Sequence, residues 1–233
     1  MSIIEFIFIG MVAVILPLIS MLSYRNMKPK LLQQHNPMRM LLYKQAFMVH
    51  GVLLISVLLM AYIRGLELAD LGFQVRLDGP FWLALVSLLL LPAYYVYKYY
   101  RIEQDNNYQQ AQVRKLQFMP GVEIAPHTTP ELKVFLLLSL SAGFCEEIFF
   151  RAYVIYYFSN WFELPAVLII SALLFGFAHG VQGLKGMLYT GIAGLLLAVV
   201  YLYTQSLLLP VVLHVLINMT SGFWVWRLNN PKN

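Results

Sequence analysis

The sequence predicts an all-α membrane protein, a polytopic bundle of about seven transmembrane helices. Three observations lead to this class. Of the 233 residues, 60% are hydrophobic and only 12% are charged, which is far more apolar than a soluble domain of this length. The apolar residues come in long runs and not in the alternation expected of half-buried strands. Lysine and arginine gather between some of these runs and are scarce between others, as the positive-inside rule predicts for an oriented membrane protein.

Seven predominantly apolar segments have the length of a transmembrane helix, roughly 17 to 25 residues. They are residues 3–22, 46–63, 81–97, 132–158, 164–180, 186–203 and 207–226. Seven spans leave no room for a sizeable soluble domain, and no internal repeat is visible. We therefore expect one integrated membrane domain. Residues 1–130 would hold the first three spans with their basic loops, and residues 131–233 a core of four spans.

The basic residues predict the orientation of the chain. Ten of them lie in the first and third connections: Arg25, Lys28, Lys30, Arg39, Lys44, Lys98, Arg101, Arg114, Lys115 and Lys133. Cytoplasmic loops carry such an excess, and alternation then leaves only Arg64 and Arg76 on outer loops. The N-terminus is expected outside and the C-terminus in the cytoplasm. The net charge of +5 is mostly this topology signal, so no nucleic-acid partner is expected.

The one long polar stretch, residues 101–130, connects the third and fourth spans. Its first half, residues 101–116, is rich in Gln, Asn and charge and is compatible with a helix that extends the third span into the cytoplasm. Three prolines and a glycine then break the helix. The hydroxyl of Thr128 or Thr129 is expected to cap the first turn of the fourth helix.

Three charged residues, Glu146, Glu147 and Arg151, lie within the fourth apolar segment. A charged side chain at bilayer depth costs at least roughly 2.5 to 3.5 kcal/mol, so these residues need partners or a chemical role. Glu147 and Arg151 are four residues apart on one helix face and are expected to form an ion pair. Glu146 is turned about 100° away and is left to face something else. The single cysteine, Cys145, excludes an internal disulfide and is expected to be a small buried residue.

Two further polar clusters lie at membrane depth. Phe175 and His179 are four residues apart near the end of the fifth segment, and His214 and Asn218 are four apart within the seventh. Each pair therefore shares one helix face. Since each polar group offsets the desolvation of the others, the three spans are expected to converge. The other histidines are His35, His50 and His127. Two of them fall in loops and His50 has no polar neighbour at helical spacing, so all three are expected to be structural.

The depth of the clusters fits this convergence imperfectly. Residue counting places Glu146 near the middle of its span and His179 near the cytoplasmic end of its own, a mismatch of about 10 Å. A tilted helix, a fifth helix that starts deep, or a fourth helix that begins outside the bilayer would remove the mismatch.

The convergent groups suit the hydrolysis of a peptide or an ester. A carboxylate in a low-dielectric site acts as general base toward water, and a neighbouring histidine holds that water in line. A second histidine and an asparagine amide donate to the oxyanion that forms on the carbonyl. Alternatively, Glu146, His179 and His214 would bind a catalytic zinc through three ligands and an open position. We favour no cofactor, because Asn218 is a poor zinc ligand but a good oxyanion donor.

The three clusters resemble a known motif set. Glu146-Glu147-x-x-x-Arg151, Phe175-x-x-x-His179 and His214-x-x-x-Asn218 are similar, in this order, to the motifs of the CAAX prenyl endopeptidase and bacteriocin-processing (Abi, or CPBP) intramembrane proteases. The resemblance covers roughly residues 132–226, and the first three spans carry no usable motif. The His-Glu-x-x-His, Gly-x-Ser-x-Gly and Gly-x-Gly-Asp signatures of other hydrolases are absent.

This resemblance implies a role for each matching residue. Glu146 would activate water, His179 would help to position it, and His214 with Asn218 would form the oxyanion site. The supporting residues would be Glu147, Arg151 and Phe175. The substrate would be a membrane-associated or lipidated peptide or protein, and the location a bacterial cytoplasmic membrane. Members of this family have varied substrates, so the resemblance indicates the reaction better than the target.

Two other functions stay open at this point. A catalytically inactive descendant would serve as a membrane scaffold or a bacteriocin-immunity protein, although the complete polar set speaks against it. A small-molecule or ion transporter would also use buried Glu, Arg and His. That function predicts inverted repeats and broken helices in both halves, and the first three spans lack matching polar residues.

Overall fold

The computed structural model describes residues 3–31, 37–74, 79–119 and 121–231, and these residues are mostly helical with no strand among them. The all-α class is thus confirmed. Arg76 and His35 lie outside the described residues. The helices are α1 (Ile3–Gly10), α2 (Leu16–Leu31), α3 (Met38–Arg64), α4 (Gly79–Gln104), α5 (Asn106–Leu116), α6 (Thr129–Glu147), α7 (Ile155–Phe158), α8 (Leu164–Ala178), α9 (Gly183–Thr204) and α10 (Leu208–Asn229). Two π-helical stretches, η1 (Met11–Ile15) and η3 (Ile148–Val154), and two 3-10 turns, η2 (Val122–Ile124) and η4 (Gly180–Gln182), complete them.

All seven predicted apolar segments lie in helical parts of the structure. Four helical segments are long and apolar enough to cross a membrane: Ile3–Leu31, Met38–Arg64, Gly180–Thr204 and Leu208–Asn229. Helix α8 is apolar but has only 15 residues. A protein with several apolar helices of this length is a membrane protein, while the number of seven spans stays a prediction.

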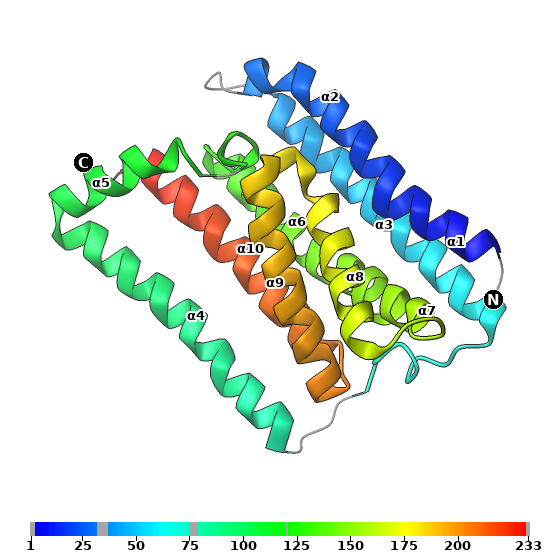
Figure 1. The fold of residues 1–233 in the computed structure, drawn as a ribbon. Helices are drawn as coiled ribbons and strands as arrows, with labels where there is room; N and C mark the ends of the chain where they lie inside the picture. The colour runs from blue at the N-terminus through cyan, green and yellow to red at the C-terminus, as the bar shows by residue number, and fades with distance from the viewer. Residues whose placement is uncertain (1–2, 32–36, 75–78, 120, 232–233) are drawn as a thin grey trace.

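The helices form a bundle with two flanks (Figure 1). The rod made by α1, η1 and α2 lies beside α3 on one flank, helices α6 to α10 form the centre, and α4 stands on the opposite flank. Helix α4 meets the bundle through α10, where Leu88 packs on Leu209 and the Lys98 ammonium lies 4.0 Å from the Trp224 ring centroid. The helices of both flanks expose large apolar side chains, as helices that face lipid do.

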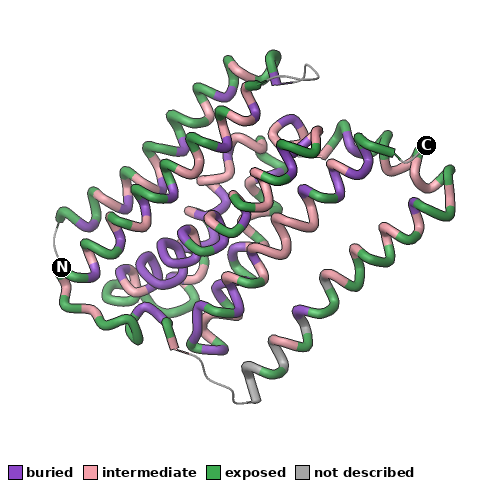
Figure 2. The backbone as a smooth tube through the Cα atoms, turned by 180° about the vertical axis from the view of Figure 1, so that it is seen from behind, coloured by how far each residue is buried: buried purple, intermediate pink, exposed green. Residues whose placement is uncertain are grey.

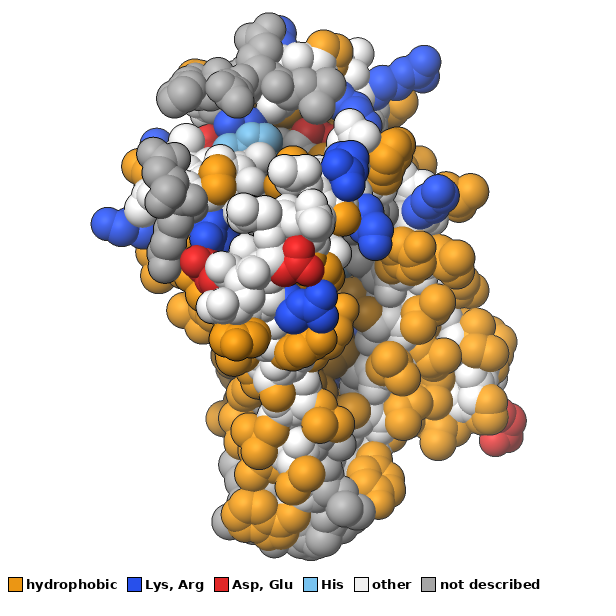
Figure 3. All heavy atoms as spheres, turned by 90° about the vertical axis from the view of Figure 1, so that its left-hand side faces the viewer, with side chains coloured by type: hydrophobic (Ala, Val, Ile, Leu, Met, Phe, Trp, Pro, Cys, Tyr) orange, Lys and Arg blue, Asp and Glu red, His pale blue; other side chains and the backbone are white. Residues whose placement is uncertain are grey.

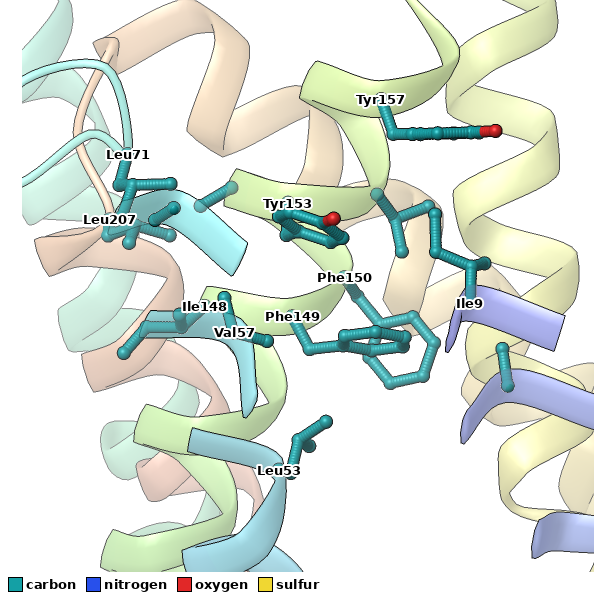
Figure 4. Packing of buried hydrophobic residues seen from close by; sticks show 14 of the residues in the cluster. Ile9, Leu53, Val57, Leu71, Ile148, Phe149, Phe150, Tyr153, Tyr157 and Leu207 are labelled. Atoms are coloured by element: carbon teal, nitrogen blue, oxygen red, sulfur yellow. The ribbon is translucent and has the colours of Figure 1, made fainter. Parts of the chain in front are cut away.

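The hydrophobic core surrounds η3 at the centre of the bundle (Figures 2 and 4). All seven residues of η3 are buried. Phe149 and Phe150 pack edge to face with their ring centroids 4.9 Å apart, and Leu53 and Val57 of α3 reach the same cluster. Such π-helical turns inside α-helices often mark functional sites. Here the turn directly follows the glutamate pair.

The connection before α6 is tied down by polar contacts. The Thr128 hydroxyl accepts from the backbone N–H of Glu131, and the Glu131 carboxylate accepts from that of Thr128, so the predicted cap is confirmed as a capping box. The buried Arg39 side chain donates from Nε to Glu131 Oε1 over 3.0 Å. Burial alone would raise the pKa of Glu131, but backbone donors at His127 and Thr128 and the charge of Arg39 hold that pKa below its usual value. These contacts fix the start of α6 against α3.

The predicted extension of the third span is only partly correct. Helix α4 ends at Gln104, and the Asp105 side chain then accepts from the backbone N–H of Tyr108 as the cap of a separate helix, α5. Because Asp105 itself is extended, the two helices are not continuous. On the face shown in Figure 3, most lysine and arginine side chains gather at one end, and most of the described side chains on the rest of the face are hydrophobic.

Candidate active site

The Glu147–Arg151 ion pair forms as the sequence predicts. Arg151 Nη1 donates to Glu147 Oε1 over 2.8 Å, and both side chains are completely buried. The same guanidinium donates from Nη2 to the carbonyl oxygen of Gly194 over 3.1 Å and lies 4.2 Å from the ring centroid of Phe175. Arg151 therefore connects η3 to both α8 and α9.

Glu147 has a second partner, which the spacing of the motifs did not predict. His214 Nδ1 lies 2.7 Å from Glu147 Oε1, so one carboxylate oxygen receives both the arginine and the imidazole. An ionised carboxylate only accepts hydrogen bonds, which assigns the proton to Nδ1 of His214. His214 thus reaches the site of convergence, but its Nδ1 faces Glu147 and not Glu146.

Glu146 turns away from this ion pair, as expected, and lies between two imidazoles. His50 Nε2 is 3.3 Å from Glu146 Oε1, and His179 Nε2 is 3.7 Å from Glu146 Oε2. The Glu146 side chain is 16% exposed, and its Oε2 is buried with no hydrogen-bond donor among the described residues. Since buried polar atoms are almost always hydrogen-bonded, this oxygen lacks a partner that a bound water or a substrate group would supply.

His50, which has no polar neighbour at helical spacing and was expected to be structural, has polar partners on another helix. Its ring contacts Glu146 through Nε2 and the Ser141 hydroxyl through Nδ1 at 3.1 Å. Both partners belong to α6, whereas His50 belongs to α3. Helical spacing within one segment does not report such a partner. The only signal in the sequence was the cost of leaving a lone imidazole at bilayer depth.

His179 ends α8 and is oriented by the preceding turn. Its Nδ1 lies 2.9 Å from the carbonyl oxygen of Phe175, which only accepts, so Nδ1 carries the proton and Nε2 points to Glu146. The expected mismatch between Glu146 and His179 is not found, since the two side chains lie 3.7 Å apart. Helix α6 begins at Thr129, before the apolar segment, and the 15 residues of α8 span only about 22 Å, which is consistent with this meeting.

Phe175 packs between the two histidines of the motif set. Its ring centroid is 4.6 Å from that of His179 and 5.6 Å from that of His214. The packing leaves no space behind the ring, since a Cβ on Gly194 would lie 2.8 Å from Phe175 Cδ1. This close approach is the reason for glycine at position 194, and it supports the expected packing role of Phe175.

Three other residues from the sequence analysis take clear positions. Asn218 lies one turn after His214 on α10, is partly exposed, and its side-chain amide forms no hydrogen bond with another described residue. Cys145 is buried, as predicted. His127 lies outside the site, where its Nε2 is 3.3 Å from the carbonyl oxygen of Val122.

A metal would need at least three protein ligands that face one point. Among the described residues, no group of three His, Cys, Asp or Glu side chains is arranged in this way. Of the ligands considered above, His214 directs Nδ1 toward Glu147 and not toward Glu146. The described side chains therefore offer zinc no preformed set of ligands.

A helical membrane protein with a buried Glu and His site has the features of an intramembrane hydrolase. Residues 128–220 match the model of a protein family described as type II CAAX prenyl endopeptidase Rce1-like. No curated protein and no solved structure gives a significant match. The matched segment begins at the cap of α6 and contains all three motif clusters. Residues 128–220 thus resemble this family of membrane peptidases, and the match supports the resemblance drawn from the three motif clusters.

The Glu147–Arg151 pair generates a prediction about folding. Glu147→Ala is expected to lower the yield of folded protein, because it leaves Arg151 buried without its carboxylate, and breaking a buried ion pair costs about 3 to 5 kcal/mol. Arg151→Ala should act in the same direction. The measurements are the monodisperse fraction extracted from membranes and its thermal unfolding in detergent. Glu163→Ala removes an exposed carboxylate and is the matched control. Normal yield and stability of both site variants would contradict the ion-pair argument.

Proposed function

We propose that the protein is an intramembrane endopeptidase in which Glu146 activates water. The reaction hydrolyses a peptide bond of a membrane-associated or lipidated peptide or protein. The observation that carries this proposal is the contrast between two adjacent carboxylates. Glu147 is neutralised by Arg151, whereas Glu146 is partly exposed and keeps one oxygen without a donor among the described residues. The family match supports the same class of reaction.

The orientation of His179 suits the binding of the attacking water. Since Nδ1–H donates to the Phe175 carbonyl, Nε2 of the neutral ring accepts a hydrogen bond. A water near Glu146 Oε2 and His179 Nε2 then donates one proton to each, and its lone pairs stay free for attack. As the water oxygen adds to the carbonyl carbon, Glu146 takes the first of these protons. It later delivers that proton to the leaving amine when the C–N bond breaks.

His214 and Asn218 are the donors for the oxyanion in this proposal. Because Nδ1–H of His214 donates to Glu147, its Nε2 donates to the oxyanion only when the ring is an imidazolium. In this proposal the imidazolium of His214 and the guanidinium of Arg151 together offset the negative charges of Glu146 and Glu147. The Asn218 amide, one turn further along α10, adds a second donor.

The decisive variant is Glu146→Ala. We expect it to abolish proteolysis while the protein still accumulates in the membrane, because Glu146 takes no part in the ion pair of Glu147. The measurement is a comparison of peptides in membrane fractions from cells that express the intact chain, Glu146→Ala or the control Glu163→Ala. Cleavage products should be present with the intact chain and with Glu163→Ala, and absent with Glu146→Ala. Normal turnover of a verified substrate by Glu146→Ala would contradict the proposal and favour a non-catalytic scaffold.

The mechanism makes a separate prediction about the oxyanion donors and metal. His214→Ala and Asn218→Ala should each lower turnover, on the order of 10² to 10³, the usual cost of losing one oxyanion donor. Elemental analysis of purified protein and activity after exhaustive chelation test the metal-free version. The alternative is stoichiometric zinc that depends on Glu146, His179 and His214, with activity restored only by adding zinc back. That result would refute the metal-free version and leave the peptidase proposal intact.

We also propose a topology of seven spans in a cytoplasmic membrane, with the N-terminus outside and the C-terminus inside. The contacts between loops support one polar end for the bundle. Lys28 pairs with Glu123 over 2.6 Å, and Asn230 donates to the carbonyl oxygen of His127 over 2.8 Å. Arg64 pairs with Glu5 at the opposite end. The distribution of basic residues assigns the first of these ends to the cytoplasm.

The topology is tested with reporters of location. A reporter fused to the C-terminus, or inserted between α2 and α3, is expected to read as cytoplasmic. A reporter inserted after Asn160, in the turn that follows α7, is expected to read as external. Opposite readings at these positions would overturn the orientation.

A further inference from the structure

Helix α3 lies outside the segment that matches the family, yet it contributes a side chain to the candidate active site. His50 is 7% exposed, and its two ring nitrogens reach two different residues of α6. Nε2 is 3.3 Å from Glu146 Oε1, and Nδ1 is 3.1 Å from Ser141 Oγ. The imidazole is therefore held at both ends by α6.

The chemistry of these partners assigns the protons. An ionised Glu146 only accepts, so Nε2 of His50 carries the proton and donates it to Oε1. Nδ1 of the neutral ring then has a lone pair, and the Ser141 hydroxyl donates to it. Ser141 thereby selects the tautomer that Glu146 needs, as second partners of functional histidines commonly do.

Packing holds His50 in this position. Leu53 and Val57 follow it by three and seven residues on α3, so all three share one buried helix face. Both side chains belong to the core cluster that contains Ile148 and Phe149 of η3 (Figure 4). The helix that carries His50 is thus packed against the stretch that directly follows Glu146 and Glu147.

We propose that His50 is a positioning residue for the reaction, and this inference rests on the proposed function. Its Nε2–H holds Oε1 of Glu146. Because the carboxylate is planar, holding one oxygen sets the direction of the other, and Oε2 is kept toward His179 and the attacking water. Without this donor, the Glu146 carboxylate rotates about its Cγ–Cδ bond, and Oε2 no longer points toward His179 and the attacking water. A misplacement of about 1 Å at a reacting group costs on the order of 10²-fold in rate.

Three substitutions at position 50 separate positioning from mere packing. His50→Leu keeps the bulk but removes the donor, and it is expected to lower kcat by about 10- to 100-fold with KM nearly unchanged. His50→Gln places an amide NH₂ near the position of Nε2 and should keep most of the turnover. His50→Asn is too short to reach Glu146 and should resemble His50→Leu. The substrate is a fluorescence-quenched peptide that spans a cleavage site found in the membrane-fraction comparison.

Ser141→Ala and a spectroscopic measurement complete the test. Ser141→Ala should also lower kcat, but by less than His50→Leu. It removes the hydroxyl that selects the tautomer of His50 and leaves the imidazole ring in place. In full-length protein in nanodiscs with ¹⁵N-labelled histidine, the His50 resonances, assigned by their loss in His50→Gln, should report a protonated Nε2. This readout does not depend on activity. An unprotonated Nε2 would overturn the proposal.

The outcomes distinguish this inference from the proposed function. If Glu146→Ala is inactive and His50→Leu, with normal thermal unfolding, has full turnover, the role of His50 is refuted and the peptidase proposal stands. Equal losses in His50→Leu and His50→Gln would also refute it, because packing alone would then explain the effect. If Glu146→Ala stays active, the proposed function itself fails.

Discussion

The buried ion pair between Glu147 and Arg151 is the interaction on which the candidate site depends. It neutralises one of two adjacent carboxylates at bilayer depth, where an unpaired charge would be strongly destabilising. The same two side chains also reach His214, the carbonyl oxygen of Gly194 and the ring of Phe175. A single ion pair within η3 and the end of α6 therefore positions α8, α9 and α10 around it.

The neighbouring Glu146 differs from Glu147 only in its surroundings. Glu147 has strong donors from Arg151 and His214, whereas Glu146 has the weaker His50 contact at 3.3 Å and a distant His179. Two identical residues that are adjacent in sequence thereby have different partners, because they point in different directions from the same helix.

Close helix packing makes this convergence possible. A Cβ on Gly143 would lie 2.5 Å from Val215 Cγ2, and a Cβ on Gly176 would lie 2.6 Å from the carbonyl oxygen of Met187. Glycine at these positions lets α6 approach α10 and α8 approach α9, as small residues do between membrane helices. Within this packing, His179 at the end of the short α8 lies 3.7 Å from Glu146 of α6.

Composition and helical spacing were enough to predict the all-α membrane class, the Glu147–Arg151 pair and the threonine cap of α6. Each of these follows from composition or from residues within one turn of a single helix, where periodicity places side chains directly. Only the tertiary structure decided that His50 reaches Glu146, that His214 bonds to Glu147, and that Asp105 separates α5 from α4. The two histidine contacts join residues of different helices. The break at Asp105 depends on whether its side chain caps a new helix or the chain continues as one helix. Helical periodicity carries no information on the rotation and depth at which two helices pack, so such contacts appear only when the bundle is assembled.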